Sequence, residues 1–65
     1  MNEVMKEWIE SLAETIFEGK GKRELCKAFG FIWATPEIIE GLKRKGHGNR
    51  EMLVDTFLAM IEEKS

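Results

Sequence analysis

The sequence has almost none of the residues that cross-link small domains. Its 65 residues include one cysteine and one histidine, so the chain cannot form an internal disulfide or complete a four-ligand Cys/His zinc site. Burial of apolar side chains must therefore hold the fold together, and a reducing, cytoplasmic location is expected.

Long apolar runs and targeting signals are also missing. The longest apolar stretch, residues 28–34, is far shorter than the roughly 20 residues that span a bilayer. No basic cluster precedes an apolar segment at the start of the chain, as it would in a secretory signal peptide. We expect neither a membrane anchor nor a signal peptide.

The composition is that of a folded domain and not of a disordered tail. Hydrophobic residues make up 43% of the chain, charged residues make up 34%, and there is a single proline. A chain this short buries only about 60% of the surface that it exposes when unfolded, so little room remains for a deep pocket. No pairing of nucleophile and base, and no convergent set of metal ligands, is recognisable. We expect no enzyme activity and no cofactor.

Charge is unevenly distributed, although the net charge is only −2. Residues 1–19 carry five glutamates and one lysine, and residues 51–65 carry four acidic side chains and one lysine. Residues 20–50 carry eight lysines and arginines but only three glutamates. Such a basic segment can mark a nucleic-acid-binding face, or it can be ordinary solvated helix surface.

Apolar residues recur at helical spacing in the first part of the chain. From Asn2 to about Glu18 they occupy one side of a helix, and the glutamates occupy the other. Asn2 is a suitable N-cap, and the glycines of residues 19–21 are expected to end the helix.

A second, shorter helix is predicted over Lys22–Phe29. Gly30 would take the left-handed conformation at its end. Residues 31–34, Phe-Ile-Trp-Ala, are then expected to form an apolar connector tucked into the core, because a lone strand would have no partner.

Two further helices follow, each with clear boundary signals. Thr35 caps the third, Pro36 fits its first position, and the helix is expected to run to about Lys45. Gly46 suits the left-handed position after it. Asn49 caps the fourth helix, which should reach almost to the last residue.

These elements predict an all-α fold, a compact bundle or orthogonal array of about four short helices that forms one domain over residues 1–65. We expect Trp8 and Cys26 in the core and methionines as gap-filling core residues: Met5, Met52 and Met60. The apolar stripe of the fourth helix comprises Leu53, Val54, Phe57, Leu58 and Ile61.

Residues 23–45 resemble a helix-turn-helix DNA-binding unit. In that family an apolar residue precedes a small one, and an apolar-Gly-apolar triplet follows after the next helical turn. The matching residues are Leu25, Cys26, Phe29, Gly30 and Phe31. The glycine would permit the turn between helices, lengthened here by residues 32–34, and Thr35 would cap the recognition helix.

The resemblance implies a third helix that faces the major groove of DNA, with Glu37, Glu40 and Lys43 toward the bases. Side chains that would contact phosphates or a partner are Lys22, Arg23, Lys27, Lys43, Arg44, Lys45, His47, Asn49 and Arg50. Two glutamates on the reading face disfavour tight binding by a monomer, so binding as a homodimer is expected.

A second resemblance covers residues 35–62. The stretch Thr-Pro-Glu-Ile-Ile-Glu-Gly-Leu at 35–42, followed by Gly46-His47 and an amphipathic helix, looks like the end of a sterile-alpha-motif domain. Two residues that the family has between Leu42 and Gly46 are missing. The resemblance implies a helical module that binds protein partners or itself.

Two functional hypotheses remain open. The first is a small regulator that binds nucleic acid through the third helix and the basic turn that follows it. The second is a protein-interaction module, or a small inhibitor of the kind that phages encode, with Trp33 as an anchor on an exposed helical face.

Overall fold

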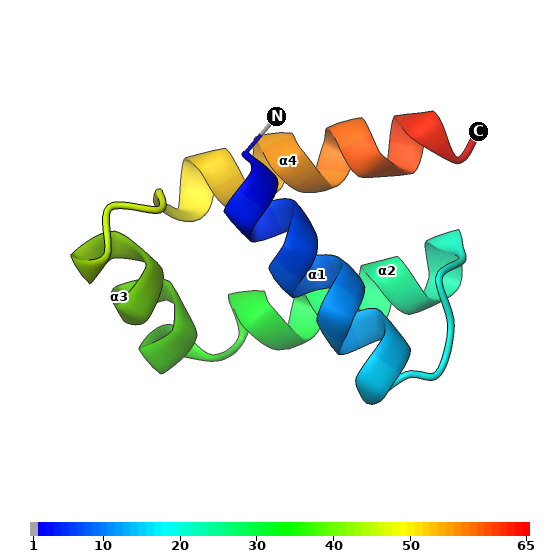
Figure 1. Ribbon diagram of the computed structural model, residues 1–65, viewed down its shortest axis with the longest axis horizontal. Coiled ribbons are helices and arrows are strands. Elements are labelled where there is room, and N and C mark those ends of the chain that lie inside the picture. The colour runs from blue at the N-terminus through cyan, green and yellow to red at the C-terminus, as the bar shows by residue number, and fades with distance from the viewer. Residues whose placement is uncertain (1) are drawn as a thin grey trace.

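The computed structural model describes residues 2–65, and within that range the chain forms four helices and no strand. They are α1 (Glu3–Thr15), α2 (Lys22–Trp33), α3 (Pro36–Arg44) and α4 (Arg50–Glu63). α1 crosses α2 and α4 obliquely and packs against both, whereas α3 lies at one end of the molecule beside α2 (Figure 1). The expected all-α fold of about four short helices is confirmed.

Each helix contributes to one apolar core. α1 buries one residue per turn at Met5, Ile9 and Ala13, and α2 does the same at Leu25, Ala28 and Ile32. The remaining buried apolar side chains are Ile39, Leu42, Leu53 and Met60. Removing a Leu, Ile or Met side chain of this size from water stabilises the fold by about 1.5–3 kcal/mol, so these residues hold the helices together.

α1 begins where the sequence predicts it and ends earlier. The Asn2 side chain accepts a hydrogen bond from the Met5 N–H at 3.1 Å, which confirms the N-cap. The helix stops at Thr15 rather than near Glu18, because Glu18 takes a left-handed conformation with φ of 57°. The carbonyl of Ala13 accepts from the N–H groups of both Phe17 and Gly19, so the chain turns before the predicted glycines.

The expectation for α2 is wrong at its C-terminal end. Gly30 has no positive φ and lies inside the helix, which continues through the supposed connector to Trp33. Of the four residues expected in the core only Ile32 is buried, one turn after Ala28 on the same face, whereas Phe31, Trp33 and Ala34 are exposed. Burial of the Ile32 side chain favours continuing the helix by more than the roughly 1 kcal/mol that an interior glycine costs. The connection to α3 is therefore Ala34-Thr35 alone.

Replacing Gly30 with alanine is expected to raise the free energy of unfolding by about 1 kcal/mol, since alanine favours the helix. An added Cβ at this position meets no atom within 4 Å. Urea denaturation measures the change. Gly46→Ala is the matched control with the opposite sign, because Gly46 has a φ of 73°. A loss of stability in Gly30→Ala would contradict the helical placement of Gly30.

The ends of α3 and α4 follow their local signals except at Thr35, whose predicted side-chain cap is wrong. Pro36 occupies the first turn of α3, while the Thr35 hydroxyl donates to the Phe31 carbonyl at 2.7 Å instead of capping the helix. After α3 the N–H of Gly46 bonds to the Lys43 carbonyl and that of His47 to the Leu42 carbonyl, as in a Schellman motif. The Asn49 side chain accepts from the Met52 N–H and caps α4 as predicted.

Several predicted core positions are on the surface. Cys26 is exposed, because the buried face of the longer α2 is centred on Leu25, Ala28 and Ile32. On α4, Met52 is 42% exposed and Leu58 is 58% exposed, because the face buried against the other helices is centred on Leu53, Thr56 and Met60. Met5 and Met60 are buried, as expected.

Candidate interaction site

An open groove lies between α1 and α3. It has a volume of about 450 Å³. Its lining residues are Glu7, Trp8, Ser11 and Leu12 from α1 and Ile38 from α3. The α1 residues occupy two successive turns of one helix face, so their side chains line one wall of the groove. Three large apolar side chains from two helices therefore meet at a surface hollow.

Trp8 is the largest side chain in this groove. It was expected in the core, but it is 36% exposed, whereas its neighbours Met5 and Ile9 on the helix are completely buried. The apolar stripe of α1 is wider than the face that α2 and α4 cover. Trp8 lies at the uncovered edge of that stripe, where it borders Ile38 across the groove.

The exposed side of α1 is acidic. Glutamates recur every three or four residues at Glu3, Glu7, Glu10 and Glu14, which places them along one side of the helix. Glu7 is also part of the groove lining. The groove therefore has an apolar floor with a carboxylate at its α1 edge.

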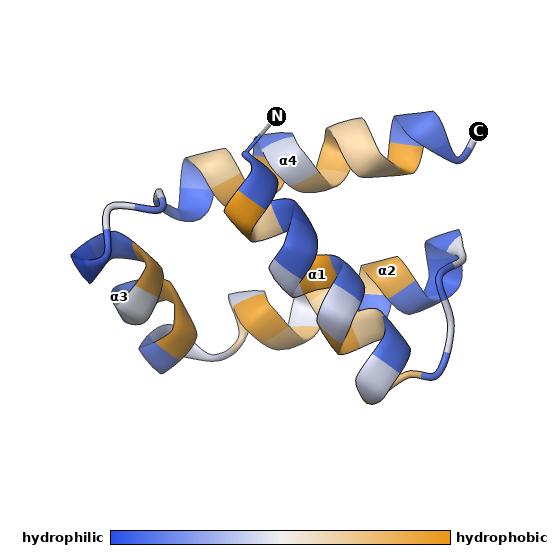
Figure 2. Cartoon of the chain, viewed as in Figure 1, coloured by the Kyte–Doolittle hydropathy of each residue, from blue (hydrophilic) through white to orange (hydrophobic). Residues whose placement is uncertain are grey.

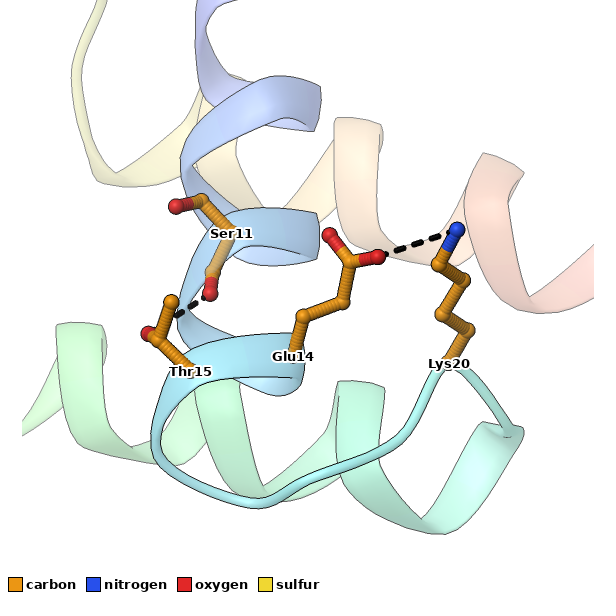
Figure 3. Close-up of polar contacts among 4 residues, drawn as sticks. All are labelled: Ser11, Glu14, Thr15 and Lys20. Atoms are coloured by element: carbon orange, nitrogen blue, oxygen red, sulfur yellow. Dashed lines mark hydrogen bonds and ion pairs between the residues drawn. The ribbon is translucent and has the colours of Figure 1, made fainter.

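One of these glutamates is paired within the chain. Glu14 Oε1 lies 2.9 Å from Nζ of Lys20 in the loop after α1, while the Thr15 hydroxyl donates to the Ser11 carbonyl on the preceding turn (Figure 3). The hydrogen bond and charge of Glu14 raise the pKa of Lys20 above its ordinary value. Among residues 2–65 the only other ion pair joins Lys43 and Glu40 at 3.8 Å. Glu7 thus has no cationic partner in the described part of the chain.

The basic residues singled out from the sequence lie in two separate groups. Lys22, Arg23 and Lys27 are exposed on the first half of α2. Lys43, Arg44 and Lys45 are exposed at the end of α3 and just after it. The start of α2 and the end of α3 lie at opposite ends of the molecule, and both are hydrophilic (Figures 1 and 2). The fold does not bring the two groups together.

Arg50 has a partner inside the molecule. Its Nη1 donates to the Trp33 carbonyl at 3.2 Å, and its guanidinium carbon lies 4.5 Å from the centroid of the Trp33 ring. This contact satisfies a carbonyl at the C-terminus of α2 and adds a cation–π interaction. Arg50 therefore links the start of α4 to the end of α2.

Trp33 belongs to an aromatic stack that continues inward. Its ring centroid is 5.8 Å from that of Phe29, which in turn stacks on Phe57 at 4.3 Å. Trp33 remains 40% exposed, but one face of its ring is covered by Arg50. It holds α2 against α4, and the 40% is the part of its surface that stays accessible beside Arg50.

The two remaining predicted site residues lie in the turn between α3 and α4. His47 is half-buried, and its carbonyl accepts a hydrogen bond from Nδ2 of Asn2 at 2.7 Å. The side chain of Asn49 is used as the α4 cap. Both residues position the turn, so only their remaining exposed atoms are available to a ligand.

The groove could not be found from the sequence alone. Ile38 lies far from Trp8 in the chain, and only the packing of α1 and α3 around α2 brings them together.

A smaller hollow of about 270 Å³ lies beside α4. Its lining residues are Asn2, Met52, Asp55, Thr56 and Ala59. It contains no exposed aromatic side chain.

The described residues contain neither a metal-binding cluster nor a membrane-spanning helix. No three His, Cys, Asp or Glu side chains within residues 2–65 converge where they could hold a metal ion. None of the four helices is long and apolar enough to cross a membrane. Comparison with protein-family models, curated proteins and solved structures finds no match to this chain. Function must therefore be inferred from the geometry of the chain itself.

Proposed function

We propose that this protein is a non-enzymatic interaction module that binds a protein partner in the groove between α1 and α3. The observation that carries the proposal is the exposure of Trp8 in an apolar groove whose other wall is Ile38. Tryptophan dominates the binding energy of many protein interfaces, because it buries a large, rigid surface when a partner covers it.

The size of the groove favours a partner that inserts side chains. A volume of about 450 Å³ accommodates a few apolar side chains from a helix or loop. Ser11 and Glu7 at the groove provide polar groups at the edge of an apolar centre, which is the usual arrangement of a protein interface.

The test uses the protein as bait in an extract of its source cells after nuclease treatment. Ser11→Arg fills the groove with a long side chain and removes no core contact, since Ser11 is exposed. Leu58→Arg introduces the same side chain on α4, away from the groove. The wild type and Leu58→Arg should recover the same protein, and Ser11→Arg should lose it. Recovery by all three baits would contradict the proposal.

A second candidate function is nucleic-acid binding at the end of α3. The observation that favours it is a run of three exposed cations, Lys43, Arg44 and Lys45, of which only Lys43 lies near a carboxylate. Against it stand Glu37 and Glu40, which are exposed on the same helix. The cations also suit the negative end of the helix dipole, which accounts for them without a ligand.

Neutralising the three cations with Lys43→Gln, Arg44→Gln and Lys45→Gln measures this second function. If the run contacts phosphates, a plot of the logarithm of the DNA-binding constant against the logarithm of the salt concentration should become less steep by about three units of slope. Arg50 stays unchanged in this variant because it holds Trp33. Fluorescence anisotropy at several salt concentrations gives the slopes. An absence of DNA binding by the wild type at low salt would eliminate this function.

A further inference from the structure

We infer that the segment that docks in the α1–α3 groove is an amphipathic helix whose apolar side chains are flanked by lysine or arginine. The inference rests on the proposed function and specifies the chemistry of the partner. Three features support it: the spacing of the lining residues, the negative charge of the one ionisable residue among them, and the lack of a cation paired with that residue in the described chain.

The lining residues repeat with the period of a helix. Trp8 and Leu12 are one turn apart on α1, which corresponds to about 6 Å along the helix axis. Apolar side chains at positions i and i+4 of a docked helix have the same separation. A partner helix that lies along α1 can therefore place one side chain beside each of them, with Ile38 closing the other side.

The charge at the groove edge is negative. Glu7 is the one charged residue among those that line the groove, and it is exposed. A helix with a basic residue beside its apolar side chains would place an opposite charge against Glu7, whereas an acidic helix would be repelled.

The chain's own nearby cations are engaged elsewhere. Lys20, in the loop that follows α1, is held by Glu14, and Arg50 lies on the Trp33 ring. Lys6 is half-buried and lies about 100° around the helix axis from Glu7. It is on the side of α1 that faces away from the groove-lining residues. The carboxylate of Glu7 is therefore available to a basic group from another molecule.

The experiment titrates the 65-residue chain into three fluorescein-labelled peptides of about five helical turns each. The first has leucines at i, i+4 and i+7 flanked by lysines. The second keeps the leucines and replaces the lysines with glutamates. The third has the composition of the first in an order that destroys the apolar stripe. Anisotropy is measured at about 150 mM salt, where weak long-range attraction is screened.

The first peptide should bind at least about tenfold more tightly than either of the others. Trp8→Ala should weaken that binding by about tenfold or more, and Leu58→Ala, which removes a more exposed apolar side chain from α4, should leave it unchanged. Glu7→Lys should bring the first and second peptides to within about twofold of each other, since it removes the charge that distinguishes them.

The remaining outcomes separate this inference from the proposed function. Equal, Trp8-dependent binding of the first two peptides would overturn the charge preference and leave the groove as the binding site. Equal binding of the first and third peptides would overturn the helical docking mode. Failure of all three peptides to bind would overturn the inference alone. Binding that is insensitive to Trp8→Ala would contradict the proposed function itself.

Discussion

Replacing Gly48 with alanine is expected to lower the free energy of unfolding by about 3 kcal/mol. Gly48 has a φ of 126°, where a side chain costs about 1–2 kcal/mol of backbone strain. An added Cβ would lie 2.6 Å from Cε of Met5 and 3.1 Å from Sδ of Met52. Met5 is completely buried, so it cannot move aside without disturbing the core, and overpacking adds about 1–3 kcal/mol.

A loss of this size is a large share of the stability of a 65-residue domain, which is on the order of 3–10 kcal/mol. Thermal denaturation followed by circular dichroism should show a fall in Tm of more than about 12 °C. Gly46→Ala is the control, since Gly46 also has a positive φ but no atom lies within 4 Å of an added Cβ. Equal losses in both variants would show that the Met5 contact is unimportant.

Replacing Trp8 with alanine is expected to weaken partner binding by about 30-fold or more, the loss typical of a dominant interface residue. The side chain is accessible at the groove and borders Leu12 and Ile38. The measurement is calorimetric titration with the protein that the wild-type bait recovers. Because much of Trp8 is buried, the same substitution should also lower stability by about 1–2 kcal/mol.

Two further variants separate binding from folding. Ser11→Arg blocks the groove without removing a packed side chain, so it should match the binding loss of Trp8→Ala at unchanged Tm. Trp33→Phe alters the other exposed tryptophan, which stacks on Phe29 under Arg50, and should lower Tm while leaving affinity within about twofold. A larger binding loss in Trp33→Phe than in Trp8→Ala would place the anchor on α2 instead.

The elements of the fold were largely predictable because their boundaries depend on local chemistry. Asn2 and Asn49 cap helices through their own side chains, and Pro36 fits only the first turn of α3. Gly46 takes a left-handed conformation that few other residues tolerate. Each of these signals operates over a few residues and needs no knowledge of tertiary contacts.

The errors occur where tertiary contacts outweigh local preference. Gly30 resembles a turn glycine in sequence, but the helix continues through it because Ile32 is buried one turn beyond Ala28. Cys26 and Trp8 belong to apolar stripes whose covered width depends on how the other helices pack. The spacing of apolar residues shows which side of a helix faces the core, but not how many residues on that side the other helices bury.

The candidate site was less predictable than the fold for the same reason. Of the residues named from the sequence, Arg50 and Trp33 contact each other, and Asn49 caps a helix. The cations that remain exposed are divided between the start of α2 and the end of α3. Trp8 and Ile38 become neighbours only through the fold, and no local pattern relates them.

The most direct test of groove binding places a photoreactive amino acid at Thr15 in one version of the protein and at Lys45 in another, then irradiates both in cells. Thr15 is exposed one turn beyond Ser11 and does not itself line the groove, and Lys45 belongs to the exposed basic run at the end of α3. If a protein partner occupies the groove, position 15 gives a discrete protein adduct that disappears in the Trp8→Ala background. A nucleic-acid adduct from position 45, with none from position 15, would contradict binding of a protein in the groove.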